Sequence, residues 1–557
     1  MQKEKPIKWI WRQSKGQGLK LLALIFVNIA FAVASILFAF AVKGVIGGAE
    51  TSNTKEITRY AIMLGAIVVS QFALRFAING LAEHISAKLE MSIKSKLFDE
   101  ILNKDYGSIN KYHSGELMTR LSSDVSIVAD GVTSIVPSTV SAVSRLIGAV
   151  IALVLIDWVF AIAFVVAGSL VFTVISLLRN RLKNLHKETQ KTDGSTRSFM
   201  QECIENLLAI KVFSVNDKIS SKSNELQDKN FRVKMRRKNY SVAGHATYNM
   251  IFSAGYIFAL IYGAFKIFRT GGLFSYGELM AILQLVNNVQ VPFASLSNVV
   301  PKYFSMIASA ERLIEIEEVS GEGDYISVDR DGFYADFDKV VFDDISFSYD
   351  RDEVISNSSL TVNKGDFIAI TGISGIGKST LLKLLLGVYK PTSGNIYFEG
   401  STGKTMVDAS TRTVFSYVPQ GNMILSGSIR DNVTFTSKGK TDEEIFNALK
   451  ISGADEFVLS LPEGLDTYVG ERGLGLSEGQ VQRLAIARAV LSGASFLLLD
   501  EATSALDEKT EKAILTNLKN LDGVTLIIIS HKKAALSICN RQVFVEDGKI
   551  LENDLKN

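Results

Sequence analysis

A glycine-rich stretch at Gly372–Ser379 carries the clearest chemistry in the chain, in the order Gly-Ile-Ser-Gly-Ile-Gly-Lys-Ser. Glycines allow the backbone to curl until several N–H groups point at one place, where phosphate oxygens can sit. Lys378 adds positive charge for those oxygens, and the hydroxyl of Ser379 can bind Mg²⁺. The spacing therefore predicts a loop that binds the β- and γ-phosphates of a nucleotide.

The residues on either side of this loop fit the interpretation. Asp366–Thr371 is a short apolar run that predicts a buried strand, and Ser379–Leu386 has the pattern of a helix. A strand, a loop and a helix in this order place the partial positive charge of the helix N-terminus beside the phosphates. This context disfavours the alternative, a glycine-rich turn that matches by chance.

Two adjacent acidic residues could supply the metal-binding and general-base groups that hydrolysis of a nucleoside triphosphate needs. Phe496–Leu499 predicts a buried strand, so Asp500 is expected at its carboxyl end, next to the phosphate loop. A carboxylate there can hold the hydration shell of Mg²⁺. Glu501 can accept a proton from the water that attacks the γ-phosphate. The alternative for Glu501 is an ordinary acid at a helix N-terminus.

Composition separates the chain into an apolar part and a mixed part. The 557 residues are 47% hydrophobic, with a mean hydropathy of +0.20, and the apolar runs concentrate before about Pro301. A net charge of +2 gives no basic field that would suggest nucleic acid. Cys203 and Cys539 lie far apart and form no pattern of a metal site or disulfide.

The apolar runs predict about six membrane-spanning helices, because a hydrocarbon core of ~30 Å needs about 20 apolar residues. They lie near Leu21–Val45, Tyr60–Leu81, Val132–Ile156, Trp158–Leu178, Val242–Phe268 and Tyr276–Tyr303. The basic N-terminal flank and the long, lysine- and arginine-rich connections 82–131 and 179–240 predict which side faces the cytosol. We therefore expect a multi-pass protein of the cytoplasmic membrane with both termini in the cytoplasm.

Several polar residues fall inside the predicted spans. Gln284, Asn287 and Asn288 share one helical face, which either lines a translocation cavity or holds helices together by hydrogen bonds. Two interpretations are open for the charged residues Arg75 and Arg145. Either they pair or snorkel for structural reasons, or they contact an anionic substrate.

A change in composition marks the boundary between the parts. The stretch from about Ile314 to Lys339 is acidic and loop-like, and strands alternate with helices after it. The predicted fold is an all-α transmembrane domain with six helices followed by an α/β phosphate-loop NTPase domain. The domains are predicted at residues 1–314 and 339–557, with a linker at 315–338.

Seven further motifs flank the phosphate loop, and their order along the chain is informative. They are Phe342–Tyr349, Val418–Gln420, Val469–Arg472, Leu476–Gln480, Phe496–Glu501, Ser504–Asp507 and Ile529–His531. In this order, and behind a membrane half, they resemble the ATP-binding cassette (ABC) transporter family. The likeness is closest to exporters with one membrane domain and one nucleotide domain per chain, and it covers nearly the whole sequence.

The resemblance implies a role for each matching residue. Glu501 and His531 are the implied catalytic residues, Tyr349 stacks on adenine, and Mg²⁺ is held through Ser379, Gln420 and Asp500. The implied contacts with ATP are Tyr349, Gly372, Ile373, Ser374, Gly375, Ile376, Gly377, Lys378, Ser379, Thr380, Gln420, Ser477, Gly479 and Gln480.

The resemblance also implies a dimer. In the family the motif at Leu476–Gln480 completes the ATP site of the opposite subunit, which here is either an identical chain or a similar one. Glu478 departs from the usual glycine, and a carboxylate near phosphate repels it unless its side chain points away. Short helices near Lys111–Ser123 and Gln201–Phe213 are implied to press on the cassettes.

The expected function is ATP-driven export by alternating access. The expected cargo is a peptide, a lipid or a hydrophobic compound, and no compact motif in the chain names which. The alternative is a regulatory or channel-like protein in which ATP gates a pore rather than driving a pump, against which Glu501 and His531 argue.

Overall fold

The computed structural model describes residues 4–270, 274–323, 325–349, 352–421, 423–470 and 473–554. The chain divides into two compact units. The first contains Met1–Glu100 and Ser114–Glu318, and the second contains Ile101–His113 and Val319–Asn557. The predicted domain limits at 314 and 339 stay predictions; the last long helix of the first unit continues to Glu317, and the first strand of the second begins at Phe337.

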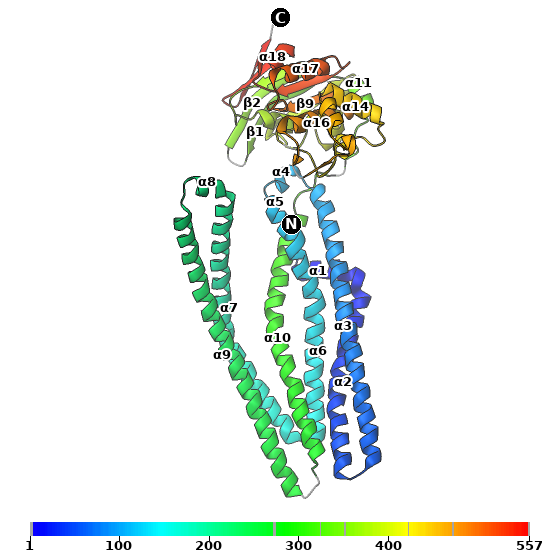
Figure 1. The fold of residues 1–557 in the computed structure, drawn as a ribbon, viewed down its shortest axis with the longest axis vertical. Coiled ribbons are helices and arrows are strands. Elements are labelled where there is room, and N and C mark those ends of the chain that lie inside the picture. The colour runs from blue at the N-terminus through cyan, green and yellow to red at the C-terminus, as the bar shows by residue number, and fades with distance from the viewer. Residues whose placement is uncertain are drawn as a thin grey trace. The chain divides into compact units, whose positions relative to one another are not determined.

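The first unit is helical (Figure 1). Among the described residues six helices of this unit are long, and each contains one of the six predicted spans, which confirms the helical transmembrane fold. Its elements are α1 (Pro6–Ser14), η1 (Lys15–Gln17), α2 (Gly18–Glu50), α3 (Thr54–Leu102), α5 (Ser114–Thr119), the π-helix η2 (Arg120–Asp124), α6 (Val125–Ile156), α7 (Trp158–Glu205), α8 (Leu207–Val212), α9 (Asn216–Thr270) and α10 (Tyr276–Glu317).

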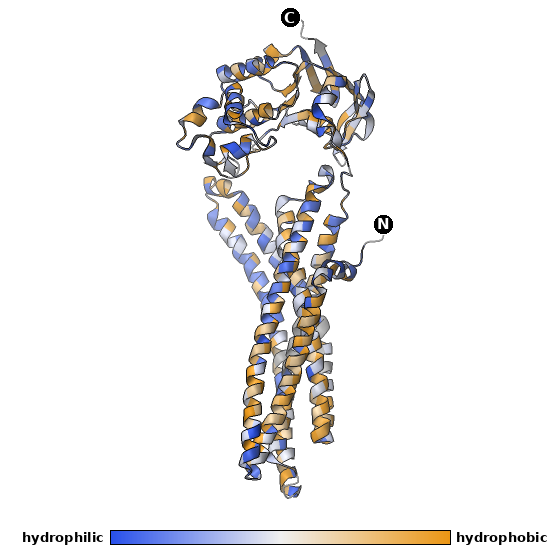
Figure 2. Ribbon diagram, turned by 90° about the vertical axis from the view of Figure 1, so that its right-hand side faces the viewer, coloured by the Kyte–Doolittle hydropathy of each residue, from blue (hydrophilic) through white to orange (hydrophobic). Residues whose placement is uncertain are grey.

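Length and hydropathy support a membrane location for this unit. Four helical segments among the described residues are long and apolar enough to cross a bilayer, namely Pro6–Glu50, Thr54–Leu102, Ser114–Ile156 and Asn216–Arg269. Figure 2 shows hydrophobic residues along much of the long helices, while hydrophilic residues gather where α7 and α9 approach α8. That division is expected of helices that extend beyond a bilayer into water.

Local sequence signals end and start these helices. Asp157 interrupts the helical run, and its carboxylate accepts a hydrogen bond of 2.9 Å from the backbone N–H of Val159 at the start of α7. Ser275 and Glu278 form a capping box at the start of α10. Within the unit, α2, α6 and α10 pack together, and α7 pairs with α9 (Figure 1).

The second unit is an α/β domain built on two main sheets, with order β2-β1-β4-β5 and β12-β11-β3-β10-β9-β6. In the larger sheet β6, β9, β10, β3 and β11 run parallel, and β12 pairs antiparallel with β11. The strands are β1 (Phe337–Tyr349), β2 (Asp352–Asn363), β3 (Phe367–Thr371), β4 (Ser393–Gly400), β5 (Gly403–Met406), β6 (Phe415–Val418), β7 (Gly427–Ser428), β8 (Tyr468–Val469), β9 (Phe496–Asp500), β10 (Thr525–Ile529), β11 (Arg541–Glu546) and β12 (Lys549–Asp554).

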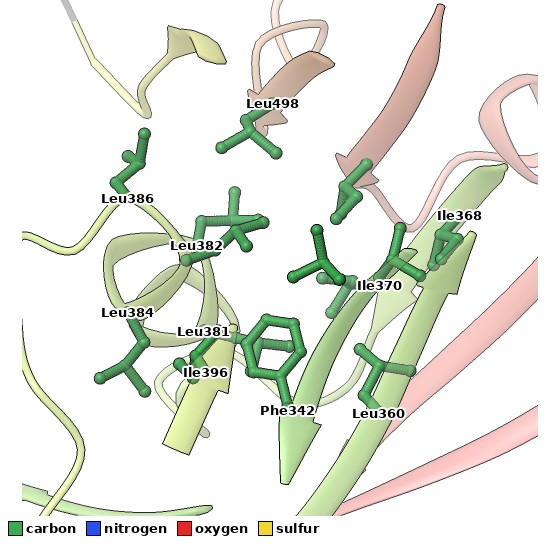
Figure 3. Close-up of a cluster of buried hydrophobic side chains, with 14 of the residues drawn as sticks. Phe342, Leu360, Ile368, Ile370, Leu381, Leu382, Leu384, Leu386, Ile396 and Leu498 are labelled. Carbon is green, nitrogen blue, oxygen red and sulfur yellow. The ribbon is translucent and has the colours of Figure 1, made fainter. Parts of the chain in front are cut away.

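Helices surround these sheets and complete the core. They are α4 (Tyr106–Ile109), α11 (Arg330–Asp336), α12 (Lys378–Leu385), η3 (Ala409–Val414), α13 (Ile429–Val433), α14 (Asp442–Ile451), α15 (Asp455–Ser460), η4 (Gly464–Asp466), α16 (Glu478–Leu491), α17 (Glu508–Lys519) and α18 (Lys533–Ile538). Figure 3 shows leucines of α12, including Leu381 and Leu382, packed against Ile370 of β3 and Leu498 of β9. This packing anchors the helix that follows the phosphate loop.

The segment Ile101–His113 folds with the second unit. The backbone N–H of Asp105 bonds to the carbonyl of Ser320 at 2.9 Å, and the ring of Tyr106 meets that of Tyr389 edge-on, with centroids 5.8 Å apart. The predicted contact helix near Lys111–Ser123 is divided between the two units: residues up to His113 belong to the second and α5 belongs to the first, so its coupling role stays a prediction. The aromatic partner of Tyr106 is distant in sequence, so local patterning could not locate this contact.

Candidate nucleotide-binding site

The phosphate loop connects the carboxyl end of β3 to α12, as the sequence predicts. Its glycines adopt left-handed φ angles: 146° at Gly372, 82° at Gly375 and 113° at Gly377. A Cβ on Gly372 would lie 2.4 Å from the carbonyl oxygen of Val545, so only glycine fits there. Lys378 donates hydrogen bonds of 2.6 and 3.0 Å to the carbonyl oxygens of Gly372 and Ile373, which places its ammonium group across the loop.

Asp500 lies at the carboxyl end of β9 and is almost fully buried, with 1% of its surface exposed. The hydroxyl of Ser379 donates to its Oδ1 at 2.9 Å, and the hydroxyl of Tyr417 donates to its Oδ2 at 3.1 Å. Burial raises the pKa of Asp500, and the hydrogen bonds from Ser379 and Tyr417 oppose that shift. Ser379 and Asp500, both predicted to bind Mg²⁺, are thus in direct contact.

Glu501 follows in a strained backbone conformation with a φ of 51°. Non-glycine residues rarely adopt this conformation, and such strain clusters at functional sites. The side-chain amide of Gln420 donates to Oε2 of Glu501 at 2.7 Å, and the backbone N–H of Glu501 bonds to the carbonyl of Ile529. The structure therefore joins Gln420 to Glu501, two residues that are 81 positions apart in the chain.

His531 lies just beyond β10, whose last residue, Ile529, pairs with Asp500 in the parallel register. Its side chain is exposed at the same edge of the sheet that carries Asp500 and Glu501. Parallel sheets bind ligands outside the carboxyl ends of their strands. The predicted contact of His531 with the γ-phosphate stays a prediction, for which this edge of the sheet is a suitable place.

Tyr349 ends β1, and its hydroxyl lies 3.2 Å from the hydroxyl of Thr380 on α12. Its ring meets the ring of Tyr389 edge-on, with centroids 5.3 Å apart, and 37% of the residue is exposed. An exposed aromatic ring tied to the helix that follows the phosphate loop is available to a nucleotide base. The predicted stacking on adenine is compatible with this placement.

We expect Tyr349→Ala to weaken ATP binding without abolishing it. Stacking of a base on an aromatic ring contributes about 1–3 kcal/mol, so the dissociation constant should rise about 5- to 150-fold. Titration of the purified protein with a fluorescent ATP analogue measures this change. Tyr468→Ala, which removes an exposed tyrosine of β8 in the same unit, is the matched control and should leave affinity unchanged; equal losses in both variants would contradict the stacking role.

The structure does not join the Leu476–Gln480 motif to the phosphate loop of its own chain. Ser477 caps α16 in a capping box: its Oγ accepts from the backbone N–H of Gln480, and the Gln480 side chain accepts from the backbone N–H of Ser477. Among the described residues no hydrogen bond connects Ser477, Gly479 or Gln480 with Gly372–Thr380. Glu478 is exposed in the first turn of α16. Glu471 and Arg472 lie outside the described residues.

Tyr417 is the site residue that sequence reasoning missed. Tyr417 lies on β6, the strand that pairs with β9, and Gln420 follows three positions later, beyond the end of that strand. The hydroxyl of a tyrosine within the apolar run Phe415–Val418 was the feature of the sequence that could have indicated a polar role. That signal is weak, because a strand of this type accommodates tyrosine for packing alone.

The polar residues of the membrane half lie in different environments. Asn288 donates a hydrogen bond of 2.9 Å to the backbone carbonyl of Ser35 on α2, which is the packing role, while Asn287 is exposed and Gln284 is half-buried on α10. The cavity role of Gln284, Asn287 and Asn288 stays a prediction.

Arg75 and Arg145 lie within electrostatic reach of each other on α3 and α6. The guanidinium of Arg145 lies 4.9 Å from the ring centroid of Phe31, and its buried Nε has no hydrogen-bond partner. In the part of the chain that the structure describes, neither arginine forms an ion pair with a carboxylate. The structure thus shows a ring contact for Arg145 but no ion pair for either arginine among the described residues, and both interpretations stay predictions.

Comparison with known proteins defines the class. The family described as "ABC transporter transmembrane region" matches residues 19–293, and the family described as "ABC transporter" matches residues 355–504. The chain therefore belongs to the ABC transporters, with the membrane region and the ATPase in one polypeptide. It is a multi-pass membrane protein that binds nucleotide and couples ATP hydrolysis to transport.

Individual relatives extend over nearly the whole chain. It is 28% identical over 538 residues to the ATP-dependent lipid A-core flippase of Syntrophus aciditrophicus (strain SB), covering 95% of this chain and 88% of that protein. It is 28% identical over 502 residues to the uncharacterized ABC transporter ATP-binding protein YwjA of Bacillus subtilis (strain 168), covering 88% and 85%. In fold it matches the structure of a bacterial Atm1-family ABC exporter with ATP bound, with a TM-score of 0.80, 21% identity and coverage of 96% and 95%.

Proposed function

We propose that this protein exports an amphiphile with an anionic headgroup across the cell membrane, using ATP and Mg²⁺. The observation that carries the proposal is the pair Arg75 and Arg145. Charged side chains at membrane depth are costly and usually face a partner, a cavity or a substrate. Two guanidinium groups inside predicted spans, without a carboxylate partner among the described residues, favour an anion as that partner. A relative whose name specifies lipid A-core as its cargo supports the same class.

The residues at the carboxyl ends of β3 and β9 fit Mg²⁺ and ATP. Magnesium prefers oxygen ligands in protein sites and usually binds through carboxylates together with substrate phosphates. Ser379 and Asp500 present a hydroxyl and a carboxylate that already touch, and the left-handed glycines form a cradle for phosphate oxygens. Bound there, Mg²⁺ would neutralise the charge that develops on the phosphates.

The chain's own residues supply the other parts of hydrolysis. Lys378 holds phosphate oxygens by its charge, and Glu501 accepts the proton of the attacking water while Gln420 orients its carboxylate. His531 contacts the γ-phosphate from the end of β10. In this proposal, Tyr349 stacks on the adenine ring and the backbone of Gly372–Thr380 surrounds the phosphates.

The proposed assembly is a dimer in which each ATP site uses two chains. Ser477, Gly479 and Gln480 have no bond to the phosphate loop of their own chain in the described structure, so a second chain is needed to bring the α16 N-terminus to the γ-phosphate. Exposed apolar residues around α8 also favour a partner: Leu208 and Phe213 are 79% and 74% exposed. A second copy of this chain supplies the covering surface in the proposal.

The proposed orientation places both termini and the cassette in the cytoplasm. The two long connections, Ala82–Gly131 and Arg179–Tyr240, carry many lysines and arginines, which the positive-inside rule assigns to the cytoplasmic side. An ATPase on that side has access to cellular ATP. Export out of the cytoplasm is the direction that this orientation gives to the transport cycle.

The proposal is tested by the stimulation of ATP hydrolysis in lipid nanodiscs. Phosphate-bearing amphiphiles should stimulate the wild type more strongly than zwitterionic lipids or cationic hydrophobic drugs do. Arg75→Ala and Arg145→Ala should lose most of this stimulation while keeping the basal rate, because each removes a charge that pairs with the headgroup. Arg59→Ala removes an exposed arginine from the outer part of the same helix as Arg75 and should behave as wild type.

The competing outcomes are distinct. Stimulation by a cationic drug or a peptide, unchanged in both arginine variants, would contradict the anionic cargo but keep the pump. Basal hydrolysis with no stimulation by any compound would favour the gating alternative.

A further inference from the structure

Both carboxylate oxygens of Asp500 carry a hydroxyl donor. Ser379 donates to Oδ1 at 2.9 Å and Tyr417 donates to Oδ2 at 3.1 Å. The two donors come from different elements, the start of α12 and strand β6. Because Asp500 is only 1% exposed, water competes little for either oxygen, and these hydroxyls decide how the carboxylate is turned.

The position of the Tyr417 hydroxyl is itself well determined. Tyr417 pairs with Leu498 in the parallel register between β6 and β9, two positions before Asp500. Its ring packs against the core that contains Phe415 and Leu498. A tyrosine ring packed against this core has fewer rotamers available than a free one, which favours the observed position of its hydroxyl beside Asp500.

We propose that Tyr417 is a positioning residue that orients Asp500 for Mg²⁺ binding. By holding Oδ2, the tyrosine keeps Oδ1 directed at Ser379, the other residue on the metal side. The inference rests on the proposed assignment of Ser379 and Asp500 to Mg²⁺. It adds a residue from β6 that does not touch metal or nucleotide and acts through Asp500.

The physical consequence of losing this hydroxyl is specific. A buried carboxylate that loses one of two donors is less well stabilised as an anion and is free to rotate about its Cβ–Cγ bond. The metal then meets a carboxylate that must be reoriented before it binds. Nucleotide binding that does not use the metal depends on other residues, such as Tyr349 and Lys378, and should not change.

Tyr417→Phe in the full chain tests the proposal, because it removes the hydroxyl and keeps the ring. Binding of a fluorescent ATP analogue is measured in excess chelator and then across a series of free Mg²⁺ concentrations. We expect the affinity in chelator to stay within about twofold of wild type, while the Mg²⁺ concentration at half-maximal enhancement rises about tenfold, the size expected for a hydrogen bond to a charged group. Tyr397→Phe, at a buried tyrosine of β4, is the matched control and should change neither value.

A thermodynamic cycle separates positioning from simple packing. In an Asp500→Asn background, Tyr417→Phe should cause no further change in the Mg²⁺ dependence, because the group it positions is already altered. Equal losses in chelator and in Mg²⁺, or a Mg²⁺ dependence within about twofold of wild type, overturn the role of Tyr417. A wild type whose ATP binding does not respond to Mg²⁺ overturns the metal assignment of Ser379 and Asp500 itself, and with it this inference.

Discussion

Glu501→Gln is expected to bind ATP with near-normal affinity and to hydrolyse it at least about 100-fold more slowly than wild type. The amide cannot accept the proton of the attacking water, and general-base catalysis of this kind contributes roughly 10²- to 10⁴-fold. Steady-state phosphate release and equilibrium ATP binding, measured on the same preparation, check both halves of the prediction. Binding should survive because Lys378 and the glycine cradle are untouched.

A second glutamate close to Glu501 in the sequence provides a matched control for this prediction. Glu508 is an exposed acid in the first turn of α17, only a few residues along the chain. Glu508→Gln should hydrolyse ATP at the wild-type rate. Near-normal hydrolysis by Glu501→Gln would remove it as the base and leave its strained φ angle of 51° without a catalytic explanation.

Ser477→Arg is expected to abolish hydrolysis while the same chain still binds ATP. In the proposed dimer, Ser477 and the N-terminus of α16 reach the γ-phosphate bound by the partner chain, and a large cationic side chain there blocks closure of the composite site. We expect a fall of at least about 100-fold in rate, the size of losing a preorganised anion-stabilising group. ATP binding in chelator should stay within about twofold, because binding begins at the chain's own phosphate loop.

Thr441 provides the matched control for this variant. Thr441 caps α14 in the same capping-box geometry that Ser477 uses on α16, with its side chain accepting from the backbone N–H of Glu444. Thr441→Arg therefore loses an equivalent cap, worth about 1 kcal/mol of stability, and gains the same cation. Loss of hydrolysis in both variants would point to a stability defect and against a composite site.

The sequence predicts the elements that surround the candidate nucleotide site, because the residues of that site lie at element boundaries. The strand before Gly372 and the strand that ends at Asp500 are both short apolar runs. They lie parallel in one sheet as β3 and β9, with β10 between them. Once these strands are parallel, the carboxyl ends must share an edge. The contact between Ser379 and Asp500 and that between Gln420 and Glu501 follow from this topology.

The contacts that escaped prediction all depend on side chains from distant elements. Tyr417 lies in an apolar strand, and its hydrogen bond to Asp500 requires the pairing of β6 with β9. Tyr106 requires the ring of Tyr389. Single-sequence patterns report periodicity along one element, so they do not reveal which hydroxyl or ring crosses to a neighbour.

In the membrane helices, too, the elements were predicted from the sequence but the contacts between them were not. Hydropathy predicted the helical spans, because bilayer thickness dictates the length of each span. Four of the described helical segments are long and apolar enough to cross a bilayer. The relation between Arg75 and Arg145 is not visible in that pattern, because the two residues lie on different helices. The absence of a carboxylate partner for either arginine among the described residues emerges only from the folded structure.

Transport by purified protein in sealed vesicles tests the central claim most directly. With cassettes facing outward, ATP should move a fluorescent phosphate-headgroup amphiphile to the inner leaflet, where a membrane-impermeant quencher cannot reach it. The protected fraction should rise with ATP in the wild type and stay at background in Glu501→Gln and in Arg145→Ala. A protected fraction that does not respond to ATP, while a zwitterionic or cationic compound is moved by the same vesicles, would contradict the export of an anionic amphiphile.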